Sequence, residues 1–156
     1  MSTKDYDLGY QKILKNLKKI KKNTRVETGF ITQELHSKKG NKSVIQVAYE
    51  NEFGEGRTPE RSFIRSTFDK KIRLWTRYTR MLCNSVATGK ISIETAMLKA
   101  GKIFEKAYKE KIMSGDSSWK PLSERRIREK GHDRPLQETY QMLNAIKSKM
   151  YGVKFK

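Results

Sequence analysis

Hydrophobic positions change their spacing several times along the chain, and each change predicts a new structural element. Residues 5–22 repeat apolar side chains every three or four positions among many lysines, which predicts a basic amphipathic helix. From Arg25 onward, RVETGFI and SVIQV have the composition of strands and the turn-rich HSKKGNK lies between them, so we expect a β-hairpin over residues 25–47. Residues 48–53 favour at least one helical turn, which Gly54 ends.

Two long helices are predicted after the loop GEGRTPER, which holds Pro59 and two glycines. Apolar stripes run from Ile64 to Val86 and from Ile93 to Ala107, and the short link ATGK between them predicts an antiparallel helical hairpin. The face of the first helix opposite its stripe is basic, and it is either solvated surface or a place where an acidic partner docks. Its residues are Lys70, Lys71, Arg73, Arg77 and Arg80.

The C-terminal quarter predicts two further helices and a closing strand. Ser123 is a suitable N-cap for a short helix over residues 124–130, and residues 136–146 have the spacing of a last helix. The tail alternates apolar and polar side chains in a way that suits a strand, through Tyr151, Val153 and Phe155.

Together these elements predict an α+β fold in which a small antiparallel or mixed β-sheet packs against a long helical hairpin and an N-terminal helix. The length of 156 residues fits one domain spanning residues 1–156. Within it, residues 1–24 form the basic N-terminal helix and residues 25–156 form the core.

The charge of the chain implies an acidic partner. Lys and Arg number 35 against 17 Asp and Glu, which gives a formal net charge of +18. Nucleic acid, an anionic membrane and an acidic protein surface all satisfy this charge, and composition does not distinguish them. No hydrophobic run approaches the length of a membrane span, so we expect no membrane contact. The single cysteine, Cys83, and an N-terminus without a secretory signal predict a reducing cytoplasm as the site of synthesis.

Catalytic and metal-binding patterns are missing from the sequence. His36 and His132 lie in predicted loops without a second ligand at metal spacing, and Cys83 lies among helical apolar residues, where we expect a buried thiol. Glu50 and Glu52 are two residues apart, and no other acidic residue is placed to complete a site with them. We therefore expect no enzyme, no cofactor and no metal.

Two separate sequence blocks carry a family resemblance. The first is AYENEFGEGRTPERSFIRSTFD, with the motif residues Glu52, Phe53, Gly54, Pro59, Arg61, Phe63, Ile64 and Arg65. The second is WKPLSERRIREKGHDRPLQETYQMLNAI, with the motif residues Pro121, Leu122, Ser123, Ile127, Lys130, Gly131, Pro135, Leu136, Thr139 and Met142. In this order, over about residues 25–155, the blocks resemble the head-tail joining and tail completion proteins of tailed bacteriophages, also called virion morphogenesis proteins. Two positions depart from that family: Ser62 stands where it usually has proline, and Tyr140 where it has glycine.

The resemblance implies a structural virion protein of the neck, the head-tail interface, assembled in the host cytoplasm. It implies a homo-oligomeric ring, hexameric or dodecameric, that completes the tail end and meets portal or adaptor proteins and tail tube or tail terminator proteins, with DNA passing through its channel. The basic surface then faces an acidic neighbour, which we favour, or contacts the genomic DNA without sequence preference. The alternative function is that of a basic, sequence-nonspecific nucleic-acid-binding protein.

The first block supplies the predicted interface of such a ring, because aromatic residues and arginines carry most interface energy. In this hypothesis Arg57, Arg61 and Arg65 pair with a neighbouring subunit or ring, while Phe53 and Phe63 anchor the loop to its own domain. The full predicted interface set is Glu52, Phe53, Gly54, Arg57, Arg61, Phe63 and Arg65.

Overall fold

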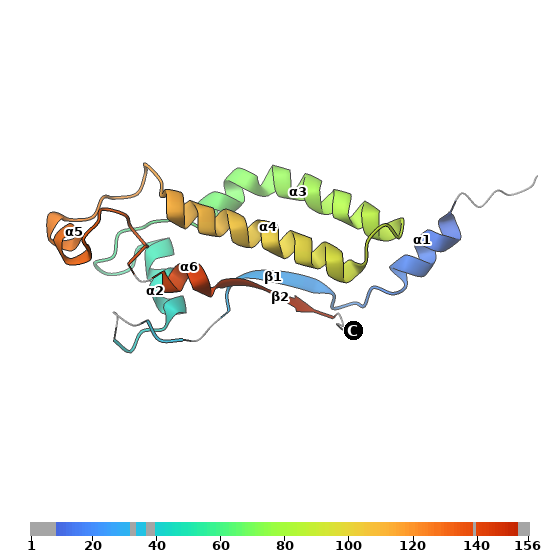
Figure 1. Cartoon of the computed structure of the whole chain (residues 1–156), viewed down its shortest axis with the longest axis horizontal. Helices are drawn as coiled ribbons and strands as arrows, with labels where there is room; N and C mark the ends of the chain where they lie inside the picture. Colours follow the sequence, from blue (N-terminus) through green and yellow to red (C-terminus); the bar gives the residue numbers. More distant parts are fainter. Residues whose placement is uncertain (1–8, 32–33, 37–39, 139, 153–156) are drawn as a thin grey trace, which may run out of the picture.

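Two antiparallel strands and two long antiparallel helices form the framework of the chain in a computed structural model, which describes residues 9–31, 34–36, 40–138 and 140–152 (Figure 1). Strand β1, Arg25–Phe30, pairs with β2, Ile146–Tyr151, in a register that sets Phe30 opposite Ile146. Helices α3, Arg65–Ala87, and α4, Ile93–Ser114, form the predicted hairpin. The predicted α+β fold with a small antiparallel sheet and a long helical hairpin is confirmed.

Helix α4 lies between α3 and the sheet, so it contributes to both sides of the core (Figure 1). Gly101 on α4 is buried, and a Cβ added there would lie 2.7 Å from both Cβ and Oγ of Ser148 on β2. Real Cβ atoms do not approach that closely, so glycine at this position sets the distance between helix and sheet.

Two hydrophobic clusters stabilise the framework. The larger gathers the C-terminal half of α4 with the α2 and α6 regions, and its fully buried side chains are Phe63, Ile112, Ile146 and Val44. Trp75 joins this cluster from α3 and packs on Phe104 and Tyr108 at ring-centroid distances of 4.6 and 5.7 Å. The smaller cluster fills the other end of the hairpin with Leu82, Val86, Ala96 and Ala100.

The predicted hairpin over residues 25–47 is wrong, because residues 44–53 form helix α2, Val44–Phe53. Ser43 and Gln46 make a capping box, with Ser43 Oγ accepting from the Gln46 N–H and the Gln46 side chain accepting from the Ser43 N–H. Val44, Val47 and Ala48 then share one buried face. The partner of β1 is β2, more than a hundred residues later. The predicted end of this helical segment at Gly54 is confirmed.

Helix α1, Tyr10–Leu17, is shorter than the predicted helix over residues 5–22, of which residues 5–8 lie outside the described residues. None of its residues is buried. It lies against the C-terminal end of α3, where Asn16 Nδ2 donates to the Ala87 carbonyl oxygen at 3.2 Å (Figure 1).

The C-terminal quarter follows the prediction in part. Helix α5, Glu124–Lys130, begins after Ser123 as predicted, and Ser123 Oγ accepts from the Arg126 N–H. Helix α6 is only Gln141–Ala145, because Leu136 and Tyr140 have positive φ angles that an α-helix does not allow. Strand β2 starts directly after it, and Val153 and Phe155 of the predicted strand lie outside the described residues.

The thiol of Cys83 is exposed, so the prediction that it is buried is wrong. The neighbouring Leu82 and Val86 face the core, and one helical position from Leu82 turns the side chain of Cys83 toward solvent.

Candidate functional site

Glu52 is buried at the end of α2, and its carboxylate holds the start of α3. Its side chain is 5% exposed. Its two oxygens accept hydrogen bonds from the backbone N–H groups of Phe63, Ile64 and Arg65 at 2.8, 2.9 and 2.9 Å. The N-cap residue of α3, Ile64, has no side-chain acceptor, so Glu52 from another helix satisfies the N–H groups at this terminus.

The electrostatics of this contact favour the ionised carboxylate. Burial raises the pKa of Glu52, but hydrogen bonds from the N–H groups of Ile64, Arg65 and Phe63 and from Ser62 outweigh it, so the pKa lies below its ordinary value. Ser62 donates from Oγ to Glu52 at 2.9 Å and accepts from the Ser66 N–H at 3.2 Å. The Ser62 hydroxyl therefore adds two hydrogen bonds at the start of α3.

Arg65 and two aromatic rings form an exposed stack beside Glu52. Arg65 donates to the carboxylates of Glu52 and Glu60 at 3.1 and 2.7 Å, and its guanidinium lies 4.4 Å from the centre of the Phe53 ring. Phe53 in turn packs on Tyr49 at 4.7 Å between ring centres. Phe53 remains 47% exposed, so this stack is part of the surface rather than of the core.

Arg61 is buried, at 6% exposure, and joins the two sequence blocks. Its backbone N–H donates to the Asn51 carbonyl oxygen at 2.6 Å, and one terminal nitrogen of its guanidinium donates to the Lys120 carbonyl oxygen at 3.0 Å. Beside it, Trp119 Nε1 donates to the Ser62 carbonyl oxygen at 3.2 Å. Segments almost sixty residues apart in the sequence are thus fastened together at one end of the molecule.

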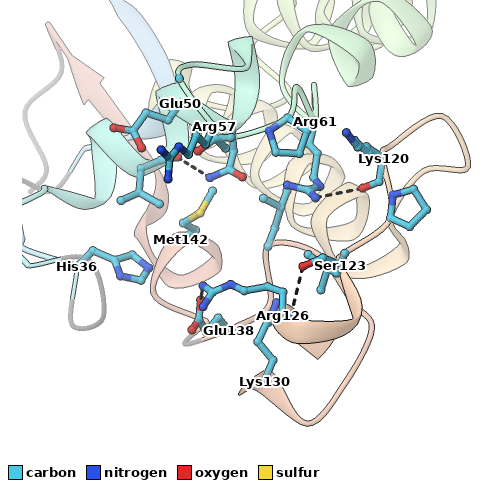
Figure 2. Close-up of a pocket in the computed structure, with 18 residues that line it drawn as sticks. His36, Glu50, Arg57, Arg61, Lys120, Ser123, Arg126, Lys130, Glu138 and Met142 are labelled. Carbon is cyan, nitrogen blue, oxygen red and sulfur yellow. Dashed lines mark hydrogen bonds and ion pairs between the residues drawn. The ribbon is translucent and has the colours of Figure 1, made fainter. Parts of the chain in front are cut away.

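A pocket of about 680 Å³ opens between these two segments and the loop that precedes α6 (Figure 2). Arg57 and Arg61 from the first block lie on one side, and Arg126 and Lys130 from α5 lie on the other. Arg126 pairs with Glu129 and Glu138 at 2.9 and 2.8 Å. The apolar part of the pocket wall is formed by Val47, Leu122, Leu136 and Met142. A pocket of this size with an apolar wall and converging cations suits an anionic group attached to something apolar.

Tyr140, the residue before α6, has a φ of 54°. This left-handed conformation is the one that glycine adopts without strain and that costs other residues about 1–2 kcal/mol. Tyr140 therefore has a backbone conformation that favours glycine.

The predicted interface residues divide into two groups. Glu52, Arg61 and Phe63 are buried in their own chain, so the part of the hypothesis that pairs Arg61 with a neighbour needs correction, while Phe63 is a fully buried anchor as predicted. Phe53, Gly54, Arg57 and Arg65 lie at the surface. Phe53 is not an inward anchor, because it packs on Tyr49 and Arg65 instead. An interface role for the exposed residues stays a prediction.

Sequence reasoning missed the helix-capping role of Glu52 and the pocket. One signal for the cap was present: α3 begins at Ile64-Arg65 without a Ser, Thr, Asp or Asn at its N-cap, while an acidic residue stands before the preceding Gly54. The pocket had no such signal, because its walls come from four separate segments.

The fold and the site define the class of the protein as a small α+β protein with a cationic pocket at one end. Comparisons with protein-family models, curated proteins and solved structures give no match to this chain. Within the described residues no group of three or more His, Cys, Asp and Glu side chains is placed to hold a metal ion. No helix among the described residues is long and apolar enough to cross a membrane.

Proposed function

We propose that the chain is a structural protein of the bacteriophage neck, which assembles as a ring that completes the tail end and joins it to the portal or adaptor. It acts without catalysis or a cofactor. The observation that carries the proposal is the convergence of the two resembling blocks, in which Arg61 donates to the Lys120 carbonyl oxygen and Trp119 to that of Ser62. The two blocks, which are separate in the sequence, thus lie together in the fold, and this supports reading them as parts of one motif.

The backbone at Tyr140 gives separate support. The bacteriophage family has glycine at this position, and the φ of 54° is a conformation that favours glycine. A backbone that favours glycine, at the position where the resembling family has glycine, therefore supports the proposal.

The surface suits assembly. Ring subunits need two different surfaces that fit each other, and apolar side chains among cations are typical of such contacts. Leu74 and Met81 on α3 are 64% and 54% exposed and lie seven residues apart on one face, with the exposed Arg77 between them. At the other end of α3, the stack of Phe53 and Arg65 offers a second exposed surface of mixed character.

Two measurements test the proposal. Native mass spectrometry of the purified chain is expected to detect a closed ring, and a chain that is monomeric at every concentration would contradict it. In a phage that lacks the gene, negative-stain images are expected to contain filled heads beside separate tails if the protein joins the two. Overlong tail tubes would assign it to the tail terminator instead, and normal particles would refute a neck role.

Nucleic-acid binding is the second candidate, and the cationic surface favours it. Exposed lysines and arginines occupy α1 and α3, among them Lys12, Lys15, Arg73, Arg77 and Arg80. Binding to duplex DNA that weakens steeply with salt and ignores sequence, in a protein that forms no ring, would favour this function over the neck.

A further inference from the structure

Arg61 carries a buried positive charge without an anionic partner. One terminal nitrogen of its guanidinium donates to the Lys120 carbonyl oxygen. The buried Nε of the same guanidinium has no hydrogen-bond partner in the described part of the chain. No described carboxylate forms an ion pair with it. Guanidinium has five N–H donors, and the single carbonyl contact leaves the buried Nε–H without an acceptor.

Such an arrangement is unfavourable unless something else completes it. A buried charge normally has a counter-ion with hydrogen-bonding geometry, because removing it from water without one is costly. Arg61 lines the pocket between the two blocks, so an anion that enters the pocket can supply the missing negative charge.

The other charged side chains of the pocket also favour the binding of an anion. Its lining holds five basic side chains, which are Arg57, Arg61, Lys120, Arg126 and Lys130, and two acidic ones, which are Glu50 and Glu138. Both carboxylates already have cationic partners, since Glu50 contacts Lys42 and Glu138 pairs with Arg126. The lining of the pocket therefore carries a net positive charge.

The apolar residues of the lining indicate which class of anion fits the pocket. Leu122 and Leu136 are half-buried and line the same pocket as the basic residues. A free inorganic anion gains nothing from such contacts, whereas a peptide with an apolar side chain next to its acidic residue does. Duplex DNA presents each phosphate beside polar sugar and further phosphate groups, so it offers little apolar surface to these leucines.

We propose that the pocket binds an acidic peptide segment of another protein. One Asp or Glu carboxylate of that segment pairs with the Arg61 guanidinium, Arg57 contributes a second cation at the surface, and an adjacent apolar side chain packs against Leu122 and Leu136. This inference goes beyond the proposed neck function and does not depend on it, because it rests on the pocket alone.

The test follows the Nε–Hε signal of Arg61 in ¹⁵N-labelled full-length protein by NMR, with the signal assigned from its loss in Arg61→Lys. The probes are the blocked peptide Leu-Glu-Leu, its uncharged counterpart Leu-Gln-Leu and a 12-base-pair DNA duplex. The Glu peptide is expected to shift the signal saturably and to bind about tenfold more tightly than the Gln peptide, since only the former offers a charge-assisted hydrogen bond.

A matched pair of variants separates the pocket from general attraction to a basic protein. Arg57→Gln removes an exposed cation that lines the pocket, and Arg128→Gln removes an exposed cation of α5 that does not. Affinity for the Glu peptide is expected to fall about fivefold or more in Arg57→Gln and less than about twofold in Arg128→Gln. These variants also carry the test if Arg61→Lys does not fold.

Four results would overturn the proposal. An unmoved Arg61 signal, or equal losses of affinity in the two glutamine variants, would show that the pocket is not the binding site. Equal affinities for the Glu and Gln peptides would show that the pocket does not recognise the carboxylate. A shift with duplex DNA as large as that with the Glu peptide would make the pocket a phosphate site. A failed ring or knockout experiment would reject the neck function and leave this result unaffected.

Discussion

Glu52 and Arg65 are joined through both backbone and side chain. Glu52 Oε1 accepts from the Arg65 N–H at 2.9 Å and from Arg65 Nε at 3.1 Å, while Arg65 donates from its terminal nitrogen to the Glu52 carbonyl oxygen at 2.7 Å. The end of α2 and the start of α3 are therefore fixed to each other, and the loop of residues 54–64 between them is held at both ends.

Glu52→Gln is expected to lower the free energy of unfolding by about 2–4 kcal/mol, since it weakens a buried acceptor that serves three backbone N–H groups. Urea denaturation followed by circular dichroism measures this loss. The control Glu50→Gln removes a carboxylate two positions away, whose partner Lys42 is exposed, and should cost less than about 1 kcal/mol. Equal effects of the two variants would contradict the capping role of Glu52.

Stability is expected to fall in acid through Glu52. Its pKa in the folded chain lies below the ordinary 4.5 because the N–H and Ser62 hydrogen bonds outweigh the effect of burial. The stabilisation from the ionised carboxylate is thus complete above about pH 4.5 and is lost as pH falls through the folded-state pKa.

The difference in unfolding free energy between the wild type and Glu52→Gln should stay constant above that pH and shrink below it. Asp116, whose pKa is also lowered by Lys111, is present in both proteins and cancels in the comparison. Urea titrations between pH 3 and 7 measure the difference. A constant difference across this range would show that the folded-state pKa of Glu52 is not lowered.

Gly101→Ala is expected to destabilise the fold by about 1–3 kcal/mol, because the new Cβ would meet Ser148 at 2.7 Å. The direction of the change is diagnostic, since Ala in a helix is otherwise more stable than Gly by about 1 kcal/mol. Gly29→Ala is the control, because a Cβ at Gly29 has no neighbour within 4 Å. Thermal unfolding measures the effect. A higher Tm for Gly101→Ala than for the wild type would show that α4 can move away from the sheet.

Tyr140→Gly is expected to be more stable than Tyr140→Ala by about 1 kcal/mol. Both variants remove the same half-exposed ring, but only glycine adopts the φ of 54° without strain. At ordinary helical or extended positions the order is reversed, so comparing the two denaturation midpoints tests the left-handed backbone itself. A more stable alanine variant would mean that Tyr140 does not have this conformation.

Arg57→Glu tests the assembly role without disturbing the core. Arg57 is exposed, whereas reversing the buried Arg61 would unfold the chain before any interface was examined. If the loop is an interface of the proposed ring, Arg57→Glu should lose the ring in native mass spectrometry while its unfolding free energy stays within about 0.5 kcal/mol of the wild type. The control Arg128→Glu makes the same charge change on α5 and should still form the ring. Intact rings in both variants would refute an interface at Arg57.

Local patterns predicted the elements whose causes are local. The stripe from Ile64 to Val86, the link containing Gly89 and the cap at Ser123 each lie within a few residues of the structure they specify, and α3, α4 and α5 formed where expected. Prediction failed at residues 44–47, where β-branched side chains favoured a strand. The capping box of Ser43 and Gln46, and burial of Val44 and Val47 on one helical face, outweighed that preference.

The sequence alone determined the α+β class, the helical hairpin and the basic surface, because periodicity, turn residues and charge are properties of neighbouring positions. Only the tertiary structure decided that β1 pairs with β2, that Glu52 caps α3 and that Arg61 is buried beside Lys120. Each of these depends on groups that are distant in sequence or on how deeply a side chain is covered. A charged residue looks the same in the sequence whether water or a buried backbone surrounds it, and that difference separates a solvated arginine from one that lines a binding pocket.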